Sequence, residues 1–149
     1  HPYYFFPNDY FKALKNLAGK HLIFISIYEP EGRFTAGGLF TLFGSMMQYH
    51  LGATTNEFLK YSPSKMMIHA AILEGMKVGA KLLHLGGGVG ANAHDGLFRF
   101  KKGFGQRLFP YSTLRLIHLP DVYNALKKKS SIMNTVENFL PEYRIQQDI

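Results

Sequence analysis

The chain of 149 residues has no cysteine. This absence excludes disulfides, thiolate metal sites and cysteine nucleophiles, and it leaves the redox compartment undetermined. The apolar runs are all far shorter than the roughly 20 residues that span a bilayer. The N-terminal stretch HPYYFFPNDYF also lacks the basic start and small-residue cleavage site of a signal peptide. We therefore expect a soluble, cytoplasmic chain without membrane insertion, and because it begins with His1 we expect it to be a piece of a longer protein.

Acidic residues are few as well. There are 10 Asp and Glu against 17 Lys and Arg, which gives a net charge of +7. This balance favours an anionic partner such as a nucleotide, a nucleic acid, a phosphorylated lipid or a bacterial wall precursor. The 46% of apolar residues and 15% of aromatic residues are enough for one packed core, so we expect a single globular domain over residues 1–149.

The first half of the chain predicts a helix followed by a β-meander. Asn8 or Asp9 can cap a helix through YFKALKNLAG, which Gly19 would end. Residues 21–53 then hold three apolar, β-branched or aromatic runs that are separated by EPEG and GS. These separators are typical of two tight turns, so the pattern predicts three antiparallel strands.

A long helix should follow the meander. Ser62 would be its N-cap and Pro63 its first residue, and it would run through SKMMIHAAILEGMKVGA. One buried stripe is expected at helical spacing, made of Ile68, Ala71, Ile72, Gly75, Met76 and Gly79. The strand KLLHL comes next, and we expect strands at about 46–52 and about 81–86 to be parallel neighbours joined by this helix.

The rest of the chain completes a mixed α/β pattern. RLFPYSTLRLIHL, residues 107–119, reads as a later strand. DVYNALKKKSSIMNTVENFL, residues 121–140, reads as a C-terminal helix with a basic surface. The predicted fold class is therefore α/β, with one mixed sheet.

A glycine cluster after the KLLHL strand suggests a nucleotide loop, but its context does not support one. Gly86, Gly88 and Ala91 satisfy G-x-G-x-x-A. A dinucleotide loop must open into a helix, and an acidic residue should follow about 20 positions later. Here NAHDG follows, and no Asp or Glu occurs from Gly96 to Pro120. No G-K-[ST] is present either, so the glycines indicate a turn, a bulge or a close approach of another chain or ligand to the backbone.

The acid-free stretch behind the glycines alternates cations with phenylalanines. Its members are Arg99, Lys101, Lys102, Arg107 and Arg115, interleaved with Phe98, Phe100, Phe104 and Phe109. As a half-buried strand or a short helix, LFRFKKGF would place cations on one side and anchoring rings on the other. Phosphate groups suit such a surface, although an ordinary solvated basic face gives the same pattern.

Three blocks in series carry a family resemblance. AGGLFTLFGSMMQYHLGATT, YSPSKMMIHAAILEGMKVGAKLLHLGGG and DGLFRFKKGFG resemble the FemAB-like aminoacyltransferases that form peptidoglycan interpeptide bridges, and the wider GNAT acetyltransferase group. The resemblance runs from about Tyr4 to about Tyr123. It implies a GNAT-like acyl-CoA N-acyltransferase fold, with an antiparallel-then-parallel mixed sheet and helices on both faces, and transfer of an acyl group from an activated carboxyl to an amine. Bridge-forming members are similar to two such domains in tandem, and this chain would be the second.

The acyl donor implied by the resemblance is not fixed. GNAT enzymes that use acetyl-coenzyme A carry [QR]-x-x-G-x-[GA], whose backbone N–H groups bind pyrophosphate. Here Gln48 is followed by Gly52 and Ala53 at a different spacing. We therefore expect no tightly bound cofactor, and a donor that is either acyl-CoA or an aminoacyl-tRNA, whose polyanion suits the net charge of +7.

The resemblance also selects candidate catalytic residues. Lys101, with Phe100 before it, matches the Phe-Lys pair that the family places beside donor and acceptor, and it would stabilise charge in the transition state. A phosphate-facing or solvated lysine is the alternative. Asp95 would orient the loop or act as a base, although Asp-Gly is also a common turn pair. Tyr49 and His50 lie near the end of the central strand, where a GNAT fold opens.

Substrate binding would fall to Gly86, Gly87, Gly88, Phe100, Arg99, Lys102 and His50. No histidine pair has metal-ligand spacing, so we predict no metal site. The G-x-S-x-G elbow of serine hydrolases is also missing, which argues against that class of enzyme. Two interpretations stay open. The domain is an N-acyl or aminoacyltransferase acting on an amine, for example of a peptidoglycan precursor, or it is a non-catalytic lobe that binds tRNA or an anionic wall precursor for a partner domain.

Overall fold

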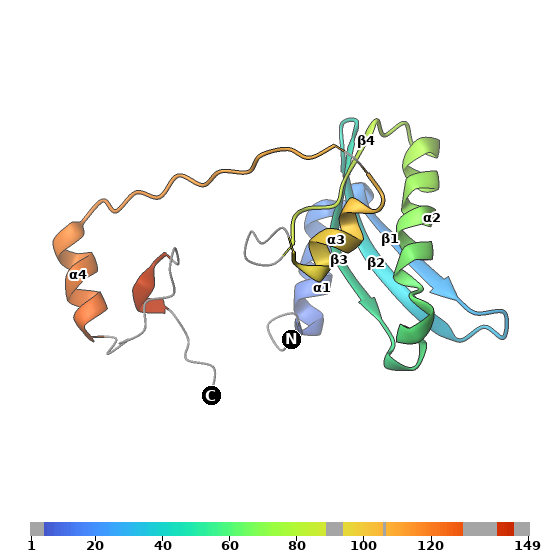
Figure 1. Cartoon of the computed structure of the whole chain (residues 1–149), viewed down its shortest axis with the longest axis horizontal. Coiled ribbons are helices and arrows are strands. Elements are labelled where there is room, and N and C mark those ends of the chain that lie inside the picture. The colour runs from blue at the N-terminus through green and yellow to red at the C-terminus, as the bar shows by residue number, and fades with distance from the viewer. Residues whose placement is uncertain (1–4, 89–93, 106, 130–139, 145–149) are drawn as a thin grey trace. The chain divides into compact units, whose positions relative to one another are not determined.

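The computed structural model describes residues 5–88, 94–105, 107–129 and 140–144 (Figure 1). The chain divides into two compact units, residues 1–106 and residues 107–149. The first unit contains the β-sheet together with the helices α1 (Asn8–Ala18), α2 (Ser64–Lys77) and α3 (Gly96–Lys102). In the described residues, the second unit contains α4 (Pro120–Lys129) and a short 3₁₀ turn, Glu142–Arg144.

The described residues of the first unit form a four-stranded mixed sheet in the order β1-β2-β3-β4. Strands β1 (Leu22–Tyr28), β2 (Phe34–Phe43) and β3 (Met46–Thr54) pair antiparallel, and β4 (Leu82–His84) is parallel to β3. Parallel neighbours need a long crossover connection, and α2 (Ser64–Lys77) lies in it. The predicted meander, the parallel pair and the mixed α/β fold class are confirmed.

The two turns of the meander depend on glycines with positive φ. Gly32 has φ of 86°, and its N–H donates to the Glu29 carbonyl at 3.0 Å. Gly44 has φ of 58° in the second turn. The left-handed region is cheap only for glycine, so the EPEG and GS signals specify these turns as expected.

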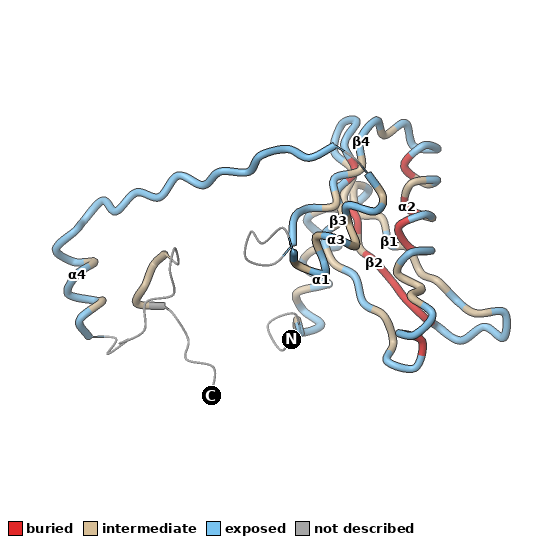
Figure 2. The backbone as a smooth tube through the Cα atoms, in the orientation of Figure 1, coloured by how far each residue is buried: buried red, intermediate tan, exposed pale blue. Residues whose placement is uncertain are grey.

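The core lies between the sheet and α2. Phe40 and Met47 from the strands, and Met67, Ile68 and Ala71 from α2, are all fully buried. Figure 2 shows the buried positions along β2 and on one side of α2. Burying a large apolar side chain contributes about 1.5–3 kcal/mol, so these few contacts hold the helix on the sheet.

The buried stripe of α2 differs in phase from the predicted one. The prediction is confirmed at Ile68, Ala71 and Gly75, whereas Met76 is 69% exposed and Gly79 lies beyond the end of the helix. Met67, which the stripe omitted, is buried instead. A Cβ atom at Gly38 of β2 would lie 2.6 Å from the Met67 sulfur. The missing side chain on the sheet therefore makes room for Met67 and sets the rotation of the helix.

Both predicted N-caps are wrong. Ser62 has φ of 51° and ends a 3₁₀ helix, Asn56–Tyr61, with its N–H bonded to the Leu59 carbonyl at 3.0 Å. An N-cap needs an extended backbone, so Ser62 cannot serve, and α2 begins at Ser64 after Pro63.

Helix α1 (Asn8–Ala18) already includes the residues that were predicted to cap it. It follows the extended backbone of Pro7, and no side-chain cap bond is formed there. Gly19, with φ of 51°, ends the helix as predicted, and its N–H donates to Lys15. In Figure 1 the sheet runs between α1 and α2, and the Tyr10 hydroxyl of α1 is 2.8 Å from Nε2 of His50 on β3.

In the second unit, the predicted strand over residues 107–119 is wrong, because these residues form no strand. A strand needs a neighbour to pair its backbone groups, and the described residues of this unit offer none. The predicted C-terminal helix is confirmed over its first part as α4, and residues 130–139 lie outside the described ones.

Candidate functional site

Lys101 lies on α3 (Gly96–Lys102), the element that the sequence left open between strand and helix. The Lys101 Nζ donates a hydrogen bond to the Gly87 carbonyl at 2.7 Å. The same atom lies 5.6 Å from the centre of the Tyr49 ring on β3. A lysine over an aromatic face makes a cation–π contact. The ammonium group is therefore held by a glycine of the loop after β4 and by a ring of the neighbouring strand.

Glycines form the walls of this position. Gly86 has φ of 72°, and a Cβ atom there would lie 3.6 Å from the Lys101 Nζ. A Cβ atom at Gly88 would lie 2.9 Å from Cγ of Asp95, and one at Gly52 would lie 2.9 Å from Cζ of Tyr49. Real Cβ atoms do not approach so closely, so Gly88 and Gly52 let a carboxylate and a phenol pack directly on the backbone. We call Gly52, Gly86, Gly87 and Gly88 the glycine seat.

Asp95 begins α3. Its Oδ2 accepts a hydrogen bond from the Phe98 N–H at 2.7 Å, and its own carbonyl accepts one from the Arg99 N–H at 3.0 Å. This is the geometry of an N-cap, which supports the turn interpretation of the Asp-Gly pair. The cap also fixes which residues of the short helix face the glycine seat.

Tyr49 is half-buried beneath the lysine. Its ring centre lies 5.3 Å from that of the core residue Phe40. Burial raises the pKa of the Tyr49 phenol above its ordinary value. The phenol is therefore neutral at physiological pH and presents both a hydrogen-bond donor and an acceptor.

The ammonium of Lys101 has two opposing influences. Burial lowers the pKa of Lys101 below its ordinary value, because a partly dry site disfavours the charged form. The nearby negative charge of Asp95 works in the other direction and raises that pKa. The site thus holds a cation whose solvation has been partly replaced by a carbonyl, a ring and a carboxylate.

The structure brings together most of the predicted site. Lys101, Asp95, Tyr49 and the glycines at 86–88 form one cluster. Phe100 points away into the core, with its ring 5.3 Å from that of Phe104. Arg99 and Lys102 are exposed on α3. His50 is also exposed, and its ring pairs with Tyr10 of α1.

Gly52 was missed as a site residue. Regular alternation along a strand would place positions 49 and 52 on opposite faces. However, the register between β2 and β3 shifts, since Phe40 pairs with Tyr49 while Leu39 pairs with Leu51. This β-bulge lets the Tyr49 ring fold across Gly52. The contact between Tyr49 and Gly52 therefore depends on the bulge and cannot be predicted from their spacing in the sequence.

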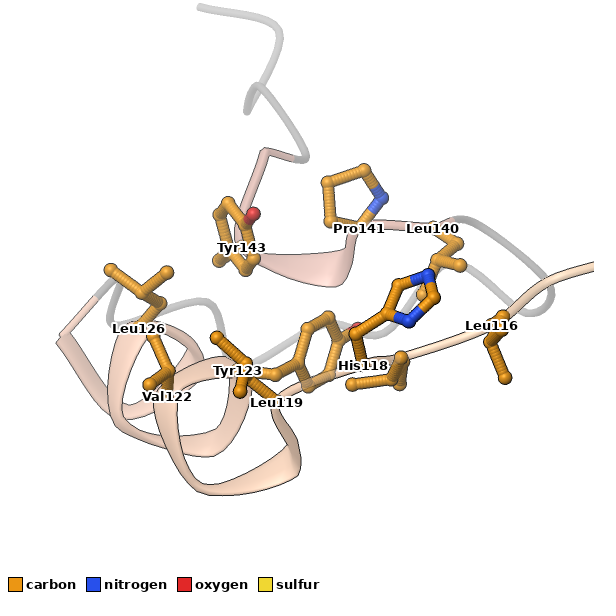
Figure 3. A pocket seen from close by; sticks show the side chains of 10 residues that line it. Leu116, His118, Leu119, Val122, Tyr123, Leu126, Leu140, Pro141 and Tyr143 are labelled. Carbon is orange, nitrogen blue, oxygen red and sulfur yellow. The ribbon is translucent and has the colours of Figure 1, made fainter.

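A pocket lies within the second unit. The pocket has a volume of about 310 Å³ and an apolar lining that includes Leu119, Val122 and Leu126 of the α4 region (Figure 3). His118 and Tyr123 also line it, and the Tyr123 and Tyr143 rings meet edge to face at 5.6 Å. No predicted site residue lies in this pocket.

The chain matches a known protein family. A model of the FemAB family matches residues 9–113, more than half of the chain, and the chain belongs to this family. The matched range spans the sheet, α2, the glycine seat and α3. Membership supports a transferase role connected with peptidoglycan. No curated protein matches the chain.

Membrane-spanning helices and clusters of metal ligands are both absent from the described residues. None of their helices has both the length and the apolar character needed to cross a bilayer. Among the same residues, no three histidine, cysteine or acidic side chains gather closely enough to hold a metal ion.

Proposed function

We propose that this chain is the transfer domain of a FemAB-type aminoacyltransferase, which moves an aminoacyl group from an aminoacyl-tRNA to an amine of a peptidoglycan precursor. Family membership supports the class of reaction. The observation that carries the proposal is the position of Lys101, whose Nζ lies between the Gly87 carbonyl and the Tyr49 ring rather than in open solvent.

The proposed reaction needs one well-placed positive charge. The amine of the acceptor attacks the ester carbon, so a C–N bond forms and the carbonyl oxygen becomes negative. The carbonyl then re-forms as the C–O bond to the tRNA ribose breaks, and the ribose oxygen takes up a proton to become a hydroxyl while the attacking amine loses one. An ammonium group has three donors, and Lys101 uses one of them on Gly87. The others are available for the oxyanion, where a donor in a dry site is most effective.

Asp95 has no acid-base role in this proposal. Its Oδ2 is engaged by the Phe98 N–H, so we assign it to building the site. Tyr49 contributes its ring to the lysine and a neutral hydroxyl. An upstream second domain of the same kind would complete the enzyme. Because aminoacyl-tRNA is made in the cytoplasm, the reaction would take place there.

The net charge of +7 supports a polyanionic donor over a small one. The chain lacks the GNAT pyrophosphate loop, so we expect acetyl-coenzyme A to bind with Kd in or above the ~mM range, about 4 kcal/mol of affinity. Calorimetry on the intact protein checks this. A micromolar Kd would favour an acyl-CoA donor and contradict the tRNA proposal.

The decisive experiment supplies the intact protein with tRNA charged with a radiolabelled amino acid and with a UDP-linked muropeptide. Transfer of label to the muropeptide is expected, and it should be lost in Lys101→Ala. If both ligands bind but no label moves under any condition, the domain is the alternative non-catalytic lobe, which holds tRNA or an anionic wall precursor for a partner domain.

A further inference from the structure

We propose that Asp95 is a positioning residue for Lys101, whose carboxylate both begins α3 and serves as the counter-charge of the Lys101 ammonium beside the Gly87 carbonyl. Its importance for transfer rests on the proposed function, but the positioning itself does not. Three observations carry it: the cap, the contact of the carboxylate with the glycine seat, and the composition of the surroundings of Lys101.

The cap decides where Lys101 emerges. Helix α3 has only 7 residues, and a helix of that length does not form by itself in water. The bond from the Phe98 N–H to Asp95 Oδ2, at 2.7 Å, satisfies one of the first free donors of the helix. Since Lys101 lies on the second turn, the start of the helix determines the direction in which its side chain leaves.

The carboxylate and the ammonium contact neighbouring glycines of the loop after β4. Asp95 packs on Gly88, where a Cβ atom would lie 2.9 Å from its Cγ. The Lys101 Nζ bonds to the carbonyl of the preceding residue, Gly87, at 2.7 Å. Opposite charges thus approach one stretch of backbone from the two ends of α3. A shift of either charged group would therefore move the backbone of residues 87–88, which contacts the other group.

The surroundings make Asp95 the relevant counter-charge. Among the described residues, the titratable groups on the elements next to Lys101 include Tyr49 of β3, His94 and Asp95 of the turn before α3, and Arg99 and Lys102 of α3 itself. Tyr49 is neutral, and its pKa is raised by burial. Arg99 and Lys102 are exposed cations, so they do not stabilise a further positive charge. The negative charge of Asp95 raises the pKa of Lys101 and so opposes the effect of burial.

Asparagine separates the two roles, because it caps helices about as well as aspartate but carries no charge. We expect Asp95→Asn to keep α3, as judged by amide hydrogen exchange over residues 98–102, and to lower the pKa of Lys101. The pKa is measured by NMR of the lysine side-chain amines, with the Lys101 signal assigned from its absence in Lys101→Ala. Asp95→Ser, a second neutral cap, should lower it in the same direction.

Asp9→Asn is the matched control, because Asp9 is an exposed acid on α1 that pairs with Lys12 at 3.0 Å. It should leave the Lys101 titration unchanged. The proposal is overturned if Lys101 titrates as in the unaltered protein in both neutral-cap variants while α3 stays protected. It is also overturned if Asp9→Asn shifts Lys101 as much as Asp95→Asn does.

The titration needs no activity, so it stands apart from the transferase proposal. If label transfer is observed, its pH profile adds a second readout. Lower pKa values for Lys101 would move the alkaline loss of transfer to lower pH in Asp95→Asn, because the ammonium deprotonates earlier. An unshifted alkaline limb, together with an unchanged Lys101 titration, would reduce Asp95 to a simple cap.

Discussion

Lys101 on α3 and Lys127 on α4 are two lysines whose pKa values shift in opposite directions. Lys101 is half-buried between a carbonyl and a ring, and burial lowers its pKa. Lys127 forms an ion pair with Glu142 in the second unit, and this hydrogen-bonded partner raises its pKa. Both residues belong to lysine-rich helix ends. The difference comes from what each ammonium group contacts.

The comparison shows why a basic stretch is not by itself a site. A lysine with a carboxylate partner at the surface is stabilised as a cation and has little reason to react or to bind further charge. A lysine that has lost water without a direct carboxylate partner is ready to stabilise a new negative charge. By this criterion we propose Lys101 as the functional lysine and assign Lys127 to the structure of the second unit.

The largest effect should come from removing Lys101. Lys101→Ala should lower transfer by about 100-fold or more, since one positioned electrostatic donor contributes on the order of 3 kcal/mol. The unfolding midpoint should stay nearly unchanged, because the side chain leaves a partly open site. Single-turnover assays and thermal melts on the same samples check both statements.

Lys102→Ala and Lys127→Ala are the matched controls, and each should retain nearly full transfer. Equal and modest losses in Lys101→Ala and Lys102→Ala, with a smaller salt dependence of tRNA binding in each, would contradict a catalytic role. The stretch would then be a polyanion-binding face, and the contrast between the two lysines would be lost.

A smaller effect is expected from filling the glycine seat. Gly88→Ala and Gly52→Ala should each destabilise the protein by about 1–3 kcal/mol, because the added methyl overlaps Asp95 or Tyr49. Gly87→Ala is the control, since a Cβ atom there meets nothing within 4 Å. Urea unfolding should show Gly87→Ala within about 0.5 kcal/mol of the parent. If all three variants were equally stable, the close packing of the seat would be wrong.

The next effect is a pair of opposite pH dependences at alkaline pH. Between its lowered pKa and the ordinary value of 10.5, Lys101 binds fewer protons when folded than when unfolded, so its contribution to stability rises with pH. Lys127, whose pKa is raised, contributes stability below 10.5 that is lost as pH passes its folded value. Side-chain amine NMR should place the two lysines on opposite sides of 10.5. Titration of both on the same side would contradict the comparison.

The smallest effect belongs to the partly buried ion pair between Lys127 and Glu142 in the second unit. The Lys127 partner lowers the pKa of Glu142 below 4.5. Its contribution is therefore present above pH 4.5 and is lost as pH falls through the folded pKa. Glu142→Gln should remove this acid dependence and return the pKa of Lys127 toward its ordinary value. Titration of the Lys127 amine in the variant checks the second point, and an unchanged Lys127 pKa would rule out the ion pair.

Much of this protein could be predicted from local sequence. EPEG and GS specify the two turns because glycine alone takes positive φ cheaply there. Runs of β-branched and aromatic residues predict β1, β2 and β3, and the length of the connection after β3 predicts a parallel β4. The ordered blocks around the glycines and the Phe-Lys pair were enough to indicate the FemAB family. All these signals lie within a few neighbouring residues or in the order of the sequence blocks.

The rest was decided by tertiary structure, because it depends on which surfaces meet. The stripe of α2 rotates onto Met67 because Gly38, on a different element, leaves room for its sulfur. Residues 107–119 have strand-like composition but form no strand, since pairing needs a neighbour and not only a pattern. A β-bulge against β2 brings the Tyr49 ring over Gly52, and the loop after β4 brings the Gly87 carbonyl to Lys101, which lies 14 residues away in the sequence. Charge, burial and register at this site are set by partners distant in sequence, which is why residue types alone could name the lysine but not its surroundings.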